Sequence, residues 1–231
     1  TPTVTAAAAA APAAPAAAAC ASGATYTVGS TGPCAGIVYY VDSAGFSCGP
    51  TLALVCNYLE VARSGWSTGG SDPTKLWAVT ANQSSNVPGV VPQPGGSGLL
   101  NVTSEIGLGY KNSVAIVTQG NDTSTAAGAA RAYAGGGTTD WYLPTSAELN
   151  LLCQWNHRLT QSVTTDCQTS GAASGTLNTG TGATTSGFMA GNYWSSSEYG
   201  RSDANIQAFT NGNQDDGGKA NTNYVRPVRA F

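Results

Sequence analysis

The chain has 231 residues, which suffices for one well-buried domain or at most two small ones. Only 9% of its residues are charged and its net charge is −3, whereas about 25% of residues are charged in an average protein. A nucleic-acid partner would require a cluster of lysine and arginine to replace the counterions of phosphates, and no such cluster is present, so the composition excludes nucleic acid.

The six cysteines form an even set without a C-x-x-C pair, the spacing that zinc sites favour. We therefore predict disulfides and an oxidising compartment outside the cytoplasm, with free buried thiols as the alternative. Other connectivities are open, but the order along the chain suggests that each cysteine pairs with its neighbour. The predicted pairs are Cys20–Cys34, Cys48–Cys56 and Cys153–Cys167.

No apolar run approaches the ~18 residues of a membrane span, so we expect no direct membrane insertion. The chain also lacks a basic segment followed by an apolar one, as a signal peptide would have. The predicted location is extracellular or at the cell surface, with any signal peptide already removed.

Residues 1–22 are rich in alanine and proline and carry no charged side chain. Pro12 and Pro15 interrupt the helix that alanine would otherwise favour. We interpret this segment as a spacer that lifts a single domain, residues 23–231, off a surface. The alternative is an arm through which copies of the chain associate, as in a filament.

The domain begins with β signals. Residues 36–41 and 58–62 are rich in β-branched and aromatic residues and are predicted as partner strands, with a turn at residues 42–45. Residues 63–102 are rich in glycine, proline, serine and asparagine and are expected to be irregular.

Helical signals follow in residues 109–134, and the clearest helix begins after Pro144. Thr145 can cap its first turn while Glu148, three residues on, returns the hydrogen bond, which is the pattern of a capping box. Apolar residues then recur at helical spacing, so we predict a core helix. The single histidine, His157, lies to the side of the apolar face, and we expect it to be solvated or at a boundary rather than catalytic.

The last forty residues, 192–231, interleave aromatic anchors with small or polar residues. Residues 204–209 alternate in polarity and then meet Asn211–Gly212, the strongest short signal for a hairpin turn. A second turn is predicted at residues 215–218. The polar run 211–223 holds no aliphatic residue larger than alanine, so we expect it to lie outside the core, on the polar surface of a rigid frame.

Three blocks carry a family resemblance: Trp141–Leu149 (WYLPTSAEL), Tyr193–Glu198 (YWSSSE) and Tyr224–Arg229 (YVRPVR). In this order they resemble the W-x-L-P-[ST]-x-x-E-L, Y-W-S-S-[ST]-E and V-R-P-V-R blocks of the Legionella collagen-like protein C-terminal family. The resemblance covers residues 35–231. It implies an α+β, C-type-lectin-like domain with a small antiparallel sheet and two or three helices, rich in loops and braced by disulfides.

The C-terminal stretch is also similar to the variable regions of proteins that diversity-generating retroelements rewrite. That similarity implies ligand contacts at positions where small or polar residues interrupt the apolar frame. The ligand-binding candidates are Arg201, Ser202, Asp203, Asn205, Gln207, Thr210, Asp215, Asp216, Gly217, Gly218, Ala220, Asn221 and Asn223.

We therefore predict a recognition module for an unknown extracellular protein or glycan. The main alternative is a structural subunit of a cell-surface layer or filament, which would associate through the N-terminal arm. An ordinary polar hairpin surface without a ligand is the third interpretation.

Signals of catalysis are missing: the sequence has no G-x-S-x-G, H-E-x-x-H or phosphate-binding glycine motif, so we expect no enzyme activity and no cofactor. Calcium is the alternative, because C-type lectins bind sugars through it. Glu198, Asp203, Asp215 and Asp216 could supply oxygen ligands. The E-P-N, Q-P-D and W-N-D signatures of those lectins are absent, so we favour a solvated acidic loop and no metal.

Overall fold

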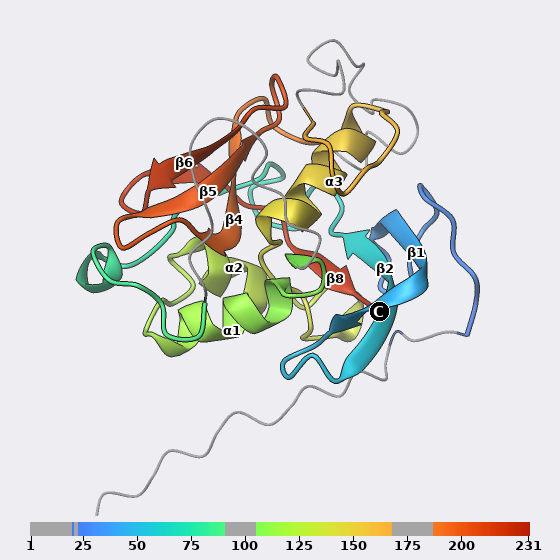
Figure 1. Cartoon of the computed structure of the whole chain (residues 1–231), viewed down its shortest axis with the longest axis horizontal. Coiled ribbons are helices and arrows are strands. Elements are labelled where there is room, and N and C mark those ends of the chain that lie inside the picture. Colours follow the sequence, from blue (N-terminus) through green and yellow to red (C-terminus); the bar gives the residue numbers. More distant parts are fainter. Residues whose placement is uncertain (1–19, 21–22, 91–104, 168–186) are drawn as a thin grey trace, which may run out of the picture.

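The computed structural model describes residues 20, 23–90, 105–167 and 187–231. Within these residues the chain adopts the predicted α+β fold (Figure 1). The predicted spacer, residues 1–22, lies outside the described residues apart from Cys20. The helices are α1 (Gly109–Thr118), α2 (Ala126–Ala132) and α3 (Ser146–Asn156), and the strands are β1 (Ile37–Cys48), β2 (Leu54–Val61), β3 (Thr74–Leu76), β4 (Asn192–Glu198), β5 (Asp203–Ala208), β6 (Gln214–Gly218), β7 (Thr222–Tyr224) and β8 (Val228–Ala230).

The smaller sheet is antiparallel, with the strand order β1-β2-β8. The turn predicted at residues 42–45 is wrong, because these residues belong to β1. The pairing with β2 instead shifts register between Val41 and Phe46. Asp42 Oδ1 accepts a hydrogen bond from Ala44 N at 2.9 Å, so a local side-chain bond accompanies a bulge rather than a chain reversal.

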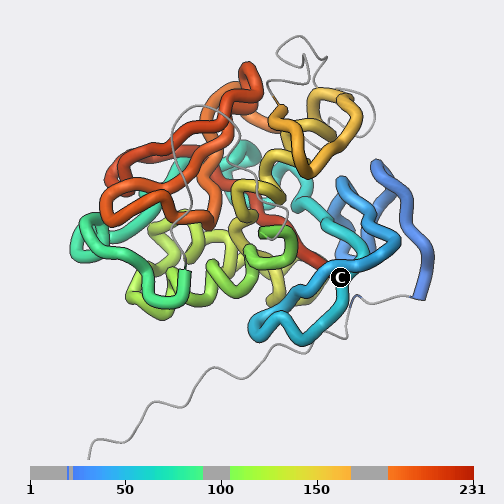
Figure 2. Tube along the Cα trace, viewed as in Figure 1, coloured from blue at the N-terminus to red at the C-terminus, as the bar shows by residue number. Residues whose placement is uncertain are grey.

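The larger sheet has the order β3-β7-β4-β5-β6. Strands β4 and β7 are parallel, and the other pairs are antiparallel. β7 belongs to this sheet and β8 to the smaller one, and residues 225–227 join them. Figure 2 shows the red C-terminal segment running from one sheet to the other. The C-terminal segment therefore ties the two sheets together.

Helix α3 lies between the two sheets and packs on β1, β4 and β5 (Figure 1). The predicted capping box is confirmed: Thr145 Oγ1 accepts from Glu148 N at 3.2 Å, and Glu148 Oε2 accepts from Thr145 N at 2.9 Å. Every residue from Ser146 to Asn156 is buried, so the helix has no solvent face.

His157, which follows α3, was expected to be solvated or at a boundary, and this prediction is wrong. It is only 3% exposed, and its Nε2 lies 2.9 Å from the carbonyl oxygen of Phe209, just after β5. Helical counting locates one apolar face of a helix, but it cannot show that another element also covers the side on which His157 lies.

The apolar core has two main clusters. The first surrounds α3 and includes Trp155, and the second contains Trp77 and Trp194 with residues of α1, α2 and β5. The helical signals of residues 109–134 are confirmed by α1 and α2. Thr125 caps α2, since its hydroxyl accepts a hydrogen bond from Gly128 N at 3.4 Å.

All three predicted disulfides are confirmed: Cys20–Cys34, Cys48–Cys56 and Cys153–Cys167. Each closes a short loop of the chain, with sequence separations of 14, 8 and 14 residues. In the described part of the chain, no helix is both long enough and apolar enough to cross a membrane.

Candidate binding surface

Strands β5 and β6 form the predicted hairpin, in register from Asp203↔Gly218 to Gln207↔Gln214. Gly212 adopts a positive φ of 76° in the connecting turn, as the Asn-Gly signal predicted. The second turn predicted at residues 215–218 is wrong, because these residues lie in β6. A Cβ atom on Gly217 would lie 3.1 Å from the Trp194 ring, so this glycine serves close packing rather than a reversal of the chain.

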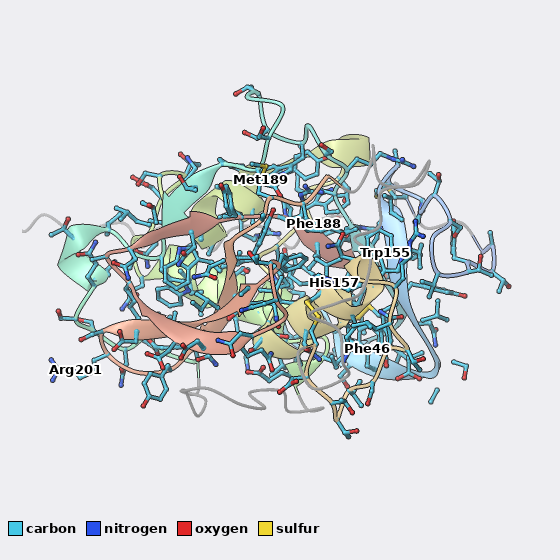
Figure 3. The ribbon with its side chains drawn as sticks, turned by 90° about the horizontal axis from the view of Figure 1, so that it is seen from above. Phe46, Trp155, His157, Phe188, Met189 and Arg201 are labelled. Carbon is cyan, nitrogen blue, oxygen red and sulfur yellow. A yellow bond between two sulfur atoms is a disulfide. The ribbon has the colours of Figure 1, made fainter. Side chains whose placement is uncertain are left out.

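Most of the predicted ligand-binding residues face solvent at least in part. Arg201, Ser202, Thr210, Ala220 and Asn221 are exposed, and Asp203, Asp215, Asp216, Gly217, Gly218 and Asn223 are partly exposed. Figure 3 shows Arg201 at the outer rim of the molecule, far from His157 and Trp155 in the interior.

Asn205 and Gln207 do not belong to that surface, because they are 0% and 1% exposed. Side chains alternate between the two faces of a strand, so these two residues share a face of β5 with Asp203. Helix α3 packs against β5 and covers the sheet there, which the alternation alone could not indicate. The expectation that both residues are displayed to a ligand is therefore corrected.

The structure brings only some of the outward residues together. Asp203 pairs with Gly218, and Asn221 N donates a hydrogen bond to Gly218 O at 2.8 Å, so these residues cluster with Ser202 at one end of the hairpin. Thr210 lies in the turn at the other end. Asn223 is on β7, three strands away from β6, or about 14 Å at normal strand spacing.

A buried ion pair holds the end of this hairpin. Lys219 Nζ contacts Glu198 Oε1, and both side chains are fully buried. The ammonium group also donates to the carbonyl oxygens of Ser85 at 2.9 Å and Arg201 at 3.0 Å, and it lies 4.7 Å from the centre of the Trp77 ring. The expectation that the run 211–223 lies outside the core is thus wrong at Lys219, as it is at Gln214.

A second buried pair joins the C-terminal segment to the loop before β3. Arg226 donates from Nε to Asp72 Oδ1 at 2.6 Å and from Nη2 to Asp72 Oδ2 at 2.8 Å. The hydroxyl of Tyr193 donates to the same carboxylate at 2.5 Å. The sequence offered no signal for Asp72, because its partners lie 121 and 154 residues away.

A third set of charges surrounds Arg229 on β8. Its Nε donates to both carboxylate oxygens of Asp140 at 2.8 Å, and its Nη1 lies 3.4 Å from Glu60 Oε2 on β2. Glu60 Oε1 accepts a hydrogen bond from Gly36 N at 2.6 Å. This network links the small sheet to Asp140, which precedes α3, and to Gly36, which precedes β1.

A profile of the Lcl C-terminal domain family matches residues 76–229, which is most of the chain. The chain belongs to the Lcl C-terminal domain family. No curated protein matches it.

The three sequence blocks that resemble the Lcl family contain the residues that make the main polar contacts inside the domain. Glu148 caps α3, Glu198 pairs with Lys219, and Arg226 and Arg229 make the two other networks. Buried charges must be paired, as Glu198, Arg226 and Arg229 are, whereas the buried carboxyl group of Glu148 is held by hydrogen bonds alone. The charged residues of the three blocks are therefore committed to the frame, and the outward residues between the blocks remain as the candidate surface.

The suggested calcium ligands are not arranged as a cage. Glu198 is committed to Lys219, and within the described residues it forms no cluster with Asp203, Asp215 or Asp216 at ligand distances. A different group, Cys153, His157 and Cys167, does lie within 4.8 Å, but its two sulfur atoms form a disulfide and so are not thiolate ligands.

Two buried carboxyl groups lie at the start of α3, where Glu148 belongs to the first turn of the helix. Burial raises the pKa of Glu105 to about 7, although a hydrogen bond from Ser197 Oγ to Glu105 Oε1 at 2.9 Å opposes the shift. Burial likewise raises the pKa of Glu148 to about 7, against the hydrogen bonds that its carboxylate accepts. Both groups therefore change charge near neutral pH in the folded protein.

We expect this protein to lose stability as the pH rises from about 4.5 to about 7, since the folded state holds these protons after the unfolded state has released them. The variant Glu105→Gln should remove about 1–3 kcal/mol of that dependence and unfold at higher urea than the wild type at pH 8. In this variant Glu148 still titrates, so a smaller loss of stability with rising pH should remain. Urea midpoints of both proteins between pH 4.5 and 8 test this, and parallel curves would refute it.

Proposed function

We propose that this Lcl domain is a recognition module that presents the outward residues of the β5–β6 hairpin to an extracellular protein or glycan. One observation carries the proposal. The ionisable side chains of the family blocks are buried and either ion-paired or hydrogen-bonded inside the domain, whereas Arg201, Ser202, Ala220 and Asn221, which lie between those blocks, are exposed around the same sheet. Such side chains can differ without disturbing the internal contacts, and a fixed surface loses little conformational entropy on binding.

Three disulfides support the proposed location outside the cytoplasm, where such bonds persist. Membership of the Lcl family supports a C-type-lectin-like arrangement, and the asparagine-rich ending supports diversification by a retroelement. The DNA beside the gene tests the last point. We expect a reverse-transcriptase gene and a near-copy of the 3′ end that differs at codons of outward residues. Differences spread equally over the codons of buried residues would count against diversification.

The binding proposal is tested with the labelled full chain on an array of glycans and extracellular proteins. The variant Ser202→Ala/Asp203→Ala/Asn221→Ala should weaken binding to any captured ligand at least tenfold. Its free energy of unfolding should stay within about 0.5 kcal/mol of the wild type, because these side chains are wholly or partly exposed.

A matched control replaces three exposed hydroxyl residues, Thr74 on β3 at the opposite edge of the larger sheet and two in the segment before it, Thr68→Ala/Ser71→Ala/Thr74→Ala. It should bind like the wild type. If the hairpin variant and this control bind the ligand equally well, the β5–β6 surface is not the binding site.

A further inference from the structure

Three side chains that can bind a soft metal ion lie together at the end of α3. Cys153 and His157 are four residues apart and so lie on the same side of the helix, and Cys167 follows in the segment after it. The sulfur and ring-nitrogen atoms of the three residues are all within 4.8 Å of one another. Figure 3 shows His157 in the interior at this end of α3. All three side chains are buried, and no other such group occurs in the described ranges.

The position of His157 does not depend on the disulfide. Its backbone N–H donates to the carbonyl oxygen of Cys153 at 2.9 Å, which continues the helical pattern. Its Nε2 lies 2.9 Å from the carbonyl oxygen of Phe209, an atom that can only accept, so Nε2 carries the proton of this hydrogen bond. Backbone carbonyls orient zinc-bound histidines in the same way. The imidazole is therefore held beside the sulfur atoms whether or not these are bonded to each other.

The segment that contains Cys167 is also held by hydrogen bonds that involve no sulfur. Cys167 N donates to Asn150 Oδ1 at 2.8 Å. The carbonyl oxygen of Thr165 accepts from Asn150 Nδ2 at 3.0 Å and from Gln154 Nε2 at 2.6 Å. Both side chains belong to α3 and are fully buried. Opening the disulfide is expected to weaken this attachment but to leave Cys167 beside Cys153.

Reduction changes what the two sulfur atoms can bind. A thiol or phosphine reductant supplies two electrons and is itself oxidised, the sulfur–sulfur bond breaks, and each sulfur takes up one proton. Zn²⁺ then displaces these two protons and bonds to both thiolates, while a ring nitrogen of His157 supplies the third ligand. Because two thiolates balance the charge of the ion, the buried centre is neutral and needs no further counter-ion.

The distances between the three residues suit zinc. Tetrahedral zinc binds sulfur at about 2.3 Å and nitrogen at about 2.0 Å, which separates its ligand atoms by about 3.5–3.8 Å. The limit of 4.8 Å observed here exceeds that separation by little more than about 1 Å, which side-chain rotation can cover. A water molecule would complete the four ligands, as in other zinc sites with three protein ligands.

We propose that Cys153, His157 and Cys167 form a zinc site when the disulfide between the two cysteines is reduced. The ion then fastens residues 165–167 to α3 in place of the covalent bond. The oxidised protein binds no zinc there, because its sulfur atoms are bonded to each other. This site is separate from the β5–β6 surface, and its metal binding does not depend on the recognition proposed for that surface.

Zinc titration of the full chain, oxidised and after reduction by a phosphine, tests the proposal. The reduced wild type should bind one Zn²⁺ at this centre, and zinc should raise its urea midpoint, whereas the oxidised protein should show neither effect. Reduced Cys48→Ala/Cys56→Ala keeps the centre and should bind like the wild type. Reduced Cys153→Ala/Cys167→Ala also has four thiols but lacks the centre, so it should bind at least a hundredfold more weakly. His157→Gln should weaken binding at least tenfold.

Co²⁺ in the reduced wild type gives a second readout that does not depend on how the variants fold. Tetrahedral cobalt with two thiolates and an imidazole absorbs strongly in the visible range and has a sulfur-to-metal charge-transfer band, whereas cobalt bound only by water has neither. A reduced wild type without these bands overturns the proposal. So does binding that is equally strong in the oxidised protein, in reduced Cys153→Ala/Cys167→Ala or in reduced His157→Gln.

Discussion

Replacing Glu198 by glutamine is expected to lower the free energy of unfolding by about 3–5 kcal/mol, because the charge of Lys219 then remains in the interior without an anionic partner. Both side chains are fully buried, so water cannot replace the lost carboxylate. The neutral amide still accepts a hydrogen bond but cannot balance the charge. Urea unfolding monitored by tryptophan fluorescence measures the loss.

Two further variants give the first prediction its controls. Glu198→Met/Lys219→Met removes both charges and should recover most of the stability, since a buried pair often contributes little net energy against apolar residues of similar size. Asp203→Asn, a partly exposed carboxylate on the same hairpin, should change the free energy of unfolding by less than about 0.5 kcal/mol. If Glu198→Gln lowers the free energy of unfolding by less than about 1 kcal/mol, which is the contribution of an exposed pair, the ion pair does not hold the hairpin.

Removing the disulfide at α3 with Cys153→Ala/Cys167→Ala is expected to lower the free energy of unfolding by about 3 kcal/mol, chiefly because the unfolded chain gains freedom. The bond fastens the segment after α3, whose backbone also contacts the helix. Asn150 accepts from Cys167 N at 2.8 Å, and Gln154 donates to Thr165 O at 2.6 Å. These contacts should weaken together when the bond is lost.

The control for this second prediction is Cys48→Ala/Cys56→Ala. That disulfide closes a shorter loop between strands that already pair with each other, so its removal should cost less than that of Cys153–Cys167. Urea unfolding of both variants and of the wild type gives the comparison. A wild type whose urea midpoint does not fall when its disulfides are reduced would contradict the expectation.

At the β5–β6 hairpin, local sequence patterns predicted the strands and most of the exposed residues, but not which residues are covered by other elements. Local alternation and the Asn-Gly turn predicted the β5–β6 hairpin, and most of the outward residues face solvent as expected. Asn205 and Gln207 were wrongly included because alternation assigns side chains to two faces without saying what covers either face. Gly217 of β6 was wrongly assigned to a turn, because close packing against Trp194 requires a glycine just as a turn does.

The sequence by itself determined the capping box of α3 and the family blocks, and the order of its cysteines suggested the three disulfides, because the partners in each case lie close along the chain. Only the tertiary structure decided which polar residues are interior, since Lys219, Asp72 and His157 are buried by partners or elements distant in sequence. The physical reason is that a charge or an imidazole becomes part of a core only when folding brings its complement to it, and no local pattern of residues encodes that meeting.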